Sequence, residues 1–312
     1  MSKTFKNILL LSVVALFACK KNTEDNQNGK IIANQYAKGF LIEDFGDYKM
    51  LSFLQPYTDR KDTIRFVLTR NKEKIRAKIA SSRIVQVPIK KMVSTSTTHI
   101  ALLEALGSLE VLKASNSLEY VYSEKVRKLA EAGKITALSE QSVELEKILA
   151  LQPDILMVSG MQASQMANYQ KIIDAGIPVL INSEWMETHP LGKAEWIKVM
   201  GLLLDKEKEA QKYFEDIVAK YQNIQKLVKE KGKKVKVAVG TPQKEQWYVP
   251  AGESFGAILL QDAGAEYAFM DTKGTGSLQM SRELVFSKFA DASVWLNAEL
   301  PQQAEAIFFC EY

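Results

Sequence analysis

Apolar and polar residues alternate along the chain between residues 38 and 70. The alternation is clearest at residues 40–42, 48–51 and 63–68, and turn-forming residues such as Gly46 and Asp47 separate the runs. Successive side chains of a strand point to opposite faces, so this pattern predicts half-buried strands joined by short turns. We expect a small antiparallel β meander with a structural role over residues 38–82.

From residue 83 onward, short apolar runs alternate with amphipathic segments. The predicted strands are at residues 92–94, 111–114, 155–158 and 178–181. The predicted helices are at residues 100–106, 142–151 and 162–175. Gly107, Pro153 and Gly176 follow these helices and end them. Strands that alternate with helices predict a parallel sheet covered on both faces.

One segment is longer than the short strands and helices that alternate before it. Apolar residues recur at three- and four-residue steps between residues 192 and 231, with no proline and with Gly201 as the only internal glycine. A helix of about forty residues would be roughly 60 Å long, and we expect a break near Leu204 and Asp205. Strands and helices resume over residues 235–297, so the long segment is predicted to connect two lobes.

The first eighteen residues are predicted to form a leader. Lys3 and Lys6 precede an apolar stretch at residues 8–18, which is shorter than the roughly 20 residues that span a bilayer. The ending Leu16-Phe17-Ala18-Cys19 resembles a bacterial lipobox, which predicts lipidation of Cys19 and anchoring on the periplasmic side of the cell envelope. An ordinary secretory leader cut near the same place is the alternative. Residues 19–37 are expected to be a flexible tether.

Composition and charge narrow the function. Hydrophobic residues make up 46% of the chain and charged residues 25%, as in ordinary globular proteins, and the formal net charge is +4. No basic face typical of nucleic-acid binding is evident, because the densest basic run, residues 229–236, reads as a solvated helix end. Cys310 is the only cysteine besides Cys19, so no disulfide framework is expected.

The sequence favours neither a metal site nor an enzyme. His99 and His189 are the only histidines, and no Cys/His spacing of ligand type occurs. Phosphate loops, dinucleotide fingerprints and nucleophile elbows are absent from the sequence. Glu187 and Glu195 are candidates for acid/base catalysis, but their place at a helix start explains them as caps. We therefore expect no cofactor, no protein-bound metal and no catalytic residues.

Several motifs, in order, resemble one family. They are the segment 85–96 followed by Ala105-Leu106-Gly107, the turn Leu145-Glu146-Lys147-Ile148 to Pro153-Asp154, the run Gly176-Ile177-Pro178-Val179, and Pro190-Leu191-Gly192-Lys193-Ala194-Glu195-Trp196. Together they are similar to the periplasmic binding proteins of ferric siderophore, haem and cobalamin ABC importers, the last motif resembling members from the Bacteroidetes.

The resemblance implies a fold class. We expect an α/β protein with two Rossmann-like lobes, one long connecting helix, a small N-terminal β meander and an incomplete second lobe. The expected parts are residues 1–18 (leader), 19–37 (tether), 38–82 (β extension), 83–190 (first lobe), 191–232 (connecting helix) and 233–312 (second lobe). Residues 299–312, with Phe308, Phe309 and Cys310, do not resemble the family's continuation, which suggests a truncated second lobe.

The resemblance also implies partners and site residues. The partners would be an ABC transporter permease and a small metal chelate or corrinoid, with the protein a monomer. By motif position, Glu146 and Glu283 would dock on the permease, although first-turn glutamates favoured by the helix dipole are the plain alternative. The ligand would lie between the lobes, beyond the carboxyl ends of the strands. Candidate contacts are Thr95, Thr97, Thr98, His99, Met161, Gln162, Trp185, Trp247, Tyr248 and Ser254.

Three functions remain open at this point. The leading one is an importer's binding protein, whose ligand is a ferric siderophore, haem or a corrinoid. The second is a surface or chaperone-like lipoprotein that binds a metallocofactor without a transporter. The third, an enzyme such as a chelatase on the same architecture, would need an acid or histidine cluster in the cleft. Each aromatic candidate is about as suited to packing a lobe as to meeting a ligand.

Overall fold

The computed structural model describes residues 29–75, 80–116 and 118–297. The predicted leader, Cys19 and residues 299–312 lie outside this range, and so does the expectation of a truncated end. No helix in the described part of the chain is both long enough and apolar enough to cross a membrane.

The N-terminal sheet has five strands in chain order. They are β1 (Lys30–Ile32), β2 (Phe40–Asp44), β3 (Lys49–Leu54), β4 (Thr63–Thr69) and β5 (Ile84–Gln86). Neighbours from β1 to β4 pair antiparallel, as the alternation predicts, and β5 joins β4 in parallel. Phe53 and Phe66 are buried under this sheet. The predicted tether is wrong over its last residues, because β1 lies within it.

A second sheet carries the first α/β layer. All its strands are parallel, in the order β10-β9-β6-β7-β8. They are β6 (Met92–Ser94), β7 (Leu112–Ser115), β8 (Thr136–Ala137), β9 (Ile155–Ser159) and β10 (Val179–Asn182). Its helices are α1 (Thr97–Ala105), α2 (Glu124–Glu131), α3 (Leu145–Leu151) and α4 (Gln170–Asp174). Both sheets share one hydrophobic core, so the N-terminal sheet is part of the first lobe.

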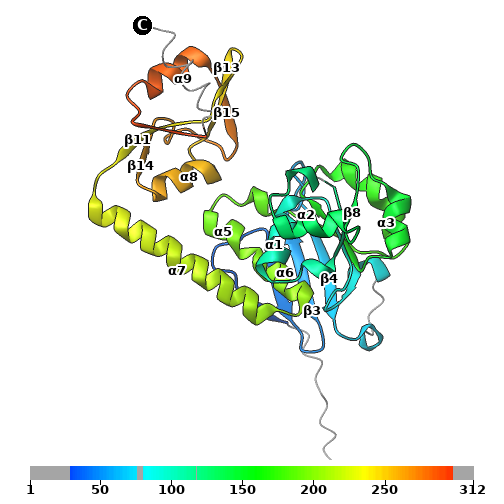
Figure 1. Cartoon of the computed structure of the whole chain (residues 1–312). Coiled ribbons are helices and arrows are strands. Elements are labelled where there is room, and N and C mark those ends of the chain that lie inside the picture. The colour runs from blue at the N-terminus through cyan, green and yellow to red at the C-terminus, as the bar shows by residue number, and fades with distance from the viewer. Residues whose placement is uncertain (1–28, 76–79, 117, 298–312) are drawn as a thin grey trace, which may run out of the picture.

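The predicted connecting helix is divided into three. The helices are α5 (Pro190–Glu195), α6 (Ile197–Leu204) and α7 (Glu207–Lys231). The break predicted near Leu204 and Asp205 is present, since Asp205 has a left-handed φ of 58°. Almost every residue of α6 is buried in the first lobe, whereas α7 buries only Ala210 and Phe214. The connector is therefore α7 alone, about 37 Å long at 1.5 Å per residue. Its first turns pack on the first lobe through Ala210 and Phe214, and the helix then runs on to the second lobe (Figure 1).

The second lobe has its own core. Parallel strands β14 (Ala265–Tyr267), β11 (Val235–Val239) and β16 (Val294–Leu296) lie in that order. An antiparallel sheet is made of β12 (Pro242–Gln243), β13 (Gln246–Pro250) and β15 (Ser277–Ser281). Its helices are α8 (Phe255–Asp262) and α9 (Arg282–Phe289). Val294 and Leu296 remain 43% and 37% exposed on the edge strand β16.

Candidate functional site

An open cavity lies at the carboxyl ends of the first-lobe strands. It has a volume of about 660 Å³. Its lining comes from the loops after β6, β7 and β8 and from the segment that follows β9, and includes Thr95, Asn116, Ser139, Gln165 and Tyr169. Ligands of parallel sheets bind at this edge because successive loops diverge there. Of the predicted contacts, Thr95 lines this cavity.

The loop after β6 is fixed by its own hydroxyl groups. Thr95 Oγ1 accepts a hydrogen bond from the Ser159 amide at 3.3 Å, which joins β6 to β9. Ser96 caps α1 by accepting from the Thr98 amide, and its hydroxyl lies 2.9 Å from that of Thr98. Thr95, Thr97 and Thr98 are all partly exposed. The loop thus presents positioned hydroxyls at the edge of the sheet.

His99 belongs to the interior. It is fully buried, its Nδ1 lies 3.0 Å from Ser94 Oγ, and burial lowers its pKa to about 3. The neutral ring therefore supports the turn between β6 and α1. This burial corrects the expectation that His99 meets a ligand.

The loop after β9 is tied to the N-terminal sheet. The Thr58 amide donates to the Met161 carbonyl at 3.1 Å, and the Ala163 amide donates to Asp59 Oδ1 at 2.9 Å. Met161 is half-buried and Gln162 is exposed. The sequence predicted a structural role for the N-terminal sheet, and these bonds show it holding a candidate binding loop.

The loop after β10 carries two further groups of interest. Trp185 is 46% exposed, and a Cβ added to Gly160 would lie 3.1 Å from its Nε1. Glu184, which sequence reasoning missed, is only 5% exposed. Burial raises the pKa of Glu184, and a hydrogen bond from the Thr98 hydroxyl opposes the rise. Trp185 was predicted from the sequence, and the glutamate beside it, just after a parallel strand, was the signal that could have identified Glu184.

Two exposed tyrosines follow β7. Tyr120 and Tyr122 are 62% and 91% exposed. Exposed apolar side chains that lie close together can mark an interaction site. Neither tyrosine was predicted as a site residue from the sequence, because both lie several residues beyond the end of β7.

The second-lobe candidates divide in the same way. Trp247 is 1% exposed, donates its indole N–H to the Val239 carbonyl at 3.0 Å, and packs on Phe286 and Phe289. Ser254 is also buried and caps α8 by accepting from an amide in its first turn. The structure therefore corrects both expectations. Tyr248, on the opposite face of β13 from Trp247, is 46% exposed.

The two lobes approach each other at α5 and α8 (Figure 1). Lys193 of α5 places its ammonium 5.1 Å from the ring centroid of Phe255, the first residue of α8. The charge of Lys193 also acts on the carboxyl of Glu184. Lys193 thus links the loop after β10 to the second lobe.

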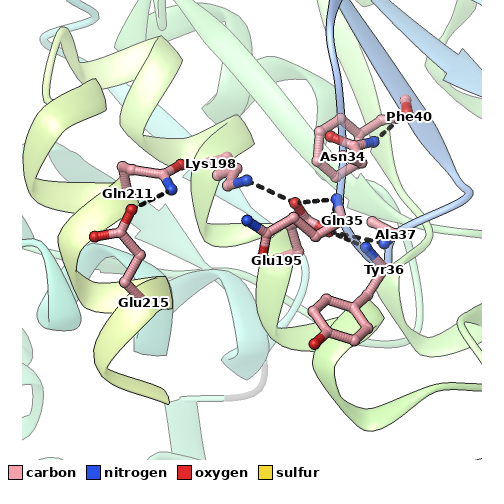
Figure 2. Close-up of polar contacts among 9 residues, drawn as sticks. All are labelled: Asn34, Gln35, Tyr36, Ala37, Phe40, Glu195, Lys198, Gln211 and Glu215. Carbon is pink, nitrogen blue, oxygen red and sulfur yellow. Dashed lines mark hydrogen bonds and ion pairs between the residues drawn. The ribbon is translucent and has the colours of Figure 1, made fainter. Parts of the chain in front are cut away.

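Glu187 and Glu195 have a structural task. Glu195 accepts hydrogen bonds from the amides of Gln35, Tyr36 and Ala37 at 2.7 to 3.1 Å, and an ion pair from Lys198 at 2.6 Å (Figure 2). Glu187 accepts from the next two amides of the same segment and from the Trp196 indole. Both carboxylates are therefore occupied in holding residues 35–39 on the first lobe.

The two predicted docking glutamates are exposed. Glu146 lies in the first turn of α3 in the first lobe, and Glu283 in the first turn of α9 in the second. Within the described ranges, no group of three or more His, Cys, Asp or Glu side chains is placed to hold a metal ion.

Known proteins resemble this chain in sequence and fold. An uncharacterized lipoprotein of Methanocaldococcus jannaschii is 28% identical over 225 residues, which is 69% of this chain. The match spans about half, 53%, of that relative's length.

Two solved structures illustrate the shared fold. One is a possible iron-binding, periplasmic solute-binding protein from Staphylococcus epidermidis, with a TM-score of 0.55, 18% identity, and coverage of 70% of this chain and 81% of that one. The other is the periplasmic vitamin B12 binding protein of Vibrio cholerae, with a TM-score of 0.51, 17% identity, and coverage of 71% and 80%. A family model described as periplasmic binding protein matches residues 92–307, so the chain belongs to the periplasmic binding protein family.

Proposed function

We propose that this protein is the substrate-binding component of an ABC importer and that it captures an iron chelate, haem or a corrinoid between its lobes. The observation that carries the proposal is the open cavity at the carboxyl edge of the first-lobe sheet, within a chain of the periplasmic binding protein family. The relatives described as binding iron or vitamin B12 support this ligand class. The protein performs no chemistry on the ligand.

The proposed binding surface is made of groups that the structure leaves accessible. The first lobe contributes Thr95, Thr97, Thr98, Met161, Gln162 and Trp185, and the second contributes Tyr248. Aromatic faces supply broad apolar contact for a chelate or a macrocycle, and hydroxyl groups supply directional hydrogen bonds. Tyr120 and Tyr122, which follow β7, are two further exposed rings of the first lobe.

The proposal places the protein on the periplasmic side of the envelope, held by a lipid on Cys19. The support is the lipobox-like sequence and the lipoprotein description of the archaeal relative. Glu146 and Glu283, one exposed on each lobe, are the proposed contacts with the permease. Charged rim contacts orient an encounter without preventing release.

Intrinsic fluorescence tests ligand capture directly. Trp196 and Trp247 are buried, whereas Trp185 is 46% exposed at the proposed site. Titration with cyanocobalamin, haemin or ferric chelates should give saturable quenching with a Kd of about 1 µM or below for at least one ligand.

The Trp185→Phe variant is the matched control. It should lose most of the quenching while isothermal titration calorimetry still detects binding, because the variant removes one contact and not the site. Failure of every compound to bind saturably by calorimetry would overturn the proposed function.

A further inference from the structure

Glu184 has an incomplete hydrogen-bond environment. Its side chain follows β10 and is 5% exposed. The Thr98 hydroxyl opposes the rise in the pKa of this carboxyl group, but Oε2 has no hydrogen-bond partner in the part of the chain that the structure describes. A buried carboxylate normally satisfies both oxygens, because taking an unpaired charge out of water is costly.

The positive charge of Lys193 does not complete this environment. Lys193 acts on Glu184 electrostatically, yet none of the described residues forms an ion pair with Glu184. The Lys193 ammonium lies instead over the Phe255 ring of the second lobe. Glu184 Oε2 is therefore a buried hydrogen-bond acceptor to which none of the described residues donates.

The surroundings of Glu184 belong to the proposed binding site. Thr98 lies in the first turn of α1, just after the loop that follows β6, and Trp185 is the residue after Glu184 along the chain. Gly160 directly follows β9, the strand between β6 and β10. The glycine leaves room for the loop after β10, since a Cβ at this position would lie 3.0 Å from Ser183 Cβ and 3.1 Å from Trp185 Nε1. Lys193 and Phe255 mark the side where the second lobe approaches.

We propose that Glu184 is a specificity-determining ligand contact, whose open carboxylate oxygen accepts an amide N–H or an ammonium group of the ligand. This inference rests on the proposed function and narrows its ligand class. A buried carboxylate attracts donors and cations and repels anions. The site therefore favours a corrinoid, whose rim bears amides, or a cationic ferric hydroxamate, over haem with its propionates or a ferric tris-catecholate.

The test compares four probes on three proteins. Cyanocobalamin, a cationic ferric hydroxamate, haemin and a ferric tris-catecholate are titrated by calorimetry against wild type, Glu184→Gln and Glu131→Gln. Glu131 is an exposed residue at the end of α2 and serves as the matched control. Wild type should prefer one of the first two probes, and Glu184→Gln should weaken that binding about tenfold or more, since hydrogen bonds to charged groups are the stronger ones.

Thermal unfolding separates this role from a structural one. Burial disfavours the charged form of Glu184, so glutamine at this position should leave the melting temperature at neutral pH unchanged or higher. Lower stability combined with unchanged affinity would overturn the assignment. So would tighter binding of haemin or the tris-catecholate by wild type, or a change below twofold in Glu184→Gln. If wild type binds none of the four, the proposed function itself fails, and this inference fails with it.

Discussion

At the residue scale, the first lobe holds two buried glutamates in opposite surroundings. Glu195 is fully buried, yet an ion pair with Lys198 and three backbone amides outweigh the effect of burial and lower its pKa. Burial dominates at Glu184 and raises its pKa. A buried carboxyl group with no compensating partner is more often found at a functional site. A buried carboxylate that is paired and hydrogen-bonded, as Glu195 is, more often stabilises the fold.

Glu195→Gln should destabilise the first lobe strongly. The substitution removes the charge that three amides and Lys198 share, at a cost of about 3 kcal/mol in the free energy of unfolding. Urea unfolding followed by tryptophan fluorescence measures it. Exposed Glu215, which accepts a hydrogen bond from Gln211 (Figure 2), provides the control, and Glu215→Gln should change stability by less than about 0.5 kcal/mol.

The loss in Glu195→Gln should depend on pH. A carboxyl whose folded pKa is lowered contributes stability above its unfolded pKa, near 4.5, and loses that contribution as pH falls through the folded value. The difference between wild type and Glu195→Gln should therefore be full at pH 7 and shrink below pH 4.5. An equal difference at pH 7 and pH 3 would contradict the role given to the charge.

The sequence predicted where the candidate site lies better than it predicted which of its residues are exposed to a ligand. The loops after the strands were identifiable because parallel strands end at one edge. The sequence did not show which of the residues in these loops and strands are buried. Trp247 and Tyr248 are adjacent in β13, and the register with β15 decides which of the two enters the core. Glu184 was missed because a single glutamate after a strand resembles any helix cap.

At the element scale, the elbow between α6 and α7 sets where the connector leaves the first lobe. Asp205 turns the chain with a left-handed φ. It also forms an ion pair of 2.5 Å with Arg70, the residue that follows β4. Gly201 lies where the two helices approach most closely, since an added Cβ would collide with that of Ala210. The elbow is thus a packed joint.

Gly201→Ala should loosen this joint. The new methyl group would also lie 3.0 Å from the Lys206 carbonyl oxygen, so the backbone must shift, at a cost of about 1–3 kcal/mol despite the better helix propensity of alanine. Gly276→Ala is the control, because no atom lies within 4 Å of a Cβ there. Equal melting temperatures for the two variants would refute the close packing.

The elements themselves were largely readable from the sequence. Alternation predicted β2 to β4, and strand-helix alternation predicted the parallel sheet. The break predicted near Leu204 and Asp205 is present, but residues 191–204 were wrongly assigned to the connector, because apolar spacing alone does not distinguish a buried helix from a bridging one. The distinction was nevertheless present: residues 197–204 are apolar on nearly every side, whereas α7 is rich in Lys and Glu.

At the scale of the whole molecule, two separate cores are joined by one helix. α7 meets the second lobe through the Tyr221 hydroxyl, which donates to Asp262 of α8 at 2.5 Å, and through Val228 against Gly264. A single stiff connector permits limited rotation of one lobe on the other, so a transporter would recognise both lobes at nearly fixed spacing.

Reversal of both proposed docking charges should affect transport and not capture. Glu146→Lys with Glu283→Lys should slow association with the transporter by about tenfold at low salt, with ligand affinity unchanged. Uptake into proteoliposomes over a range of salt concentrations measures this. Glu131→Lys controls for net charge on the first lobe, and transport equal to wild type in the double variant would exclude these two glutamates from docking.

The grip of Glu187 and Glu195 on residues 35–39 also has a mechanical consequence. If the N-terminus is attached to a lipid, a pull from the membrane reaches the folded protein at residues 35–39. The hydrogen bonds from these residues to Glu187 and Glu195 then pass the force to the first lobe next to α5. The second lobe, whose covalent link to the first lobe is α7, lies outside the path of this load.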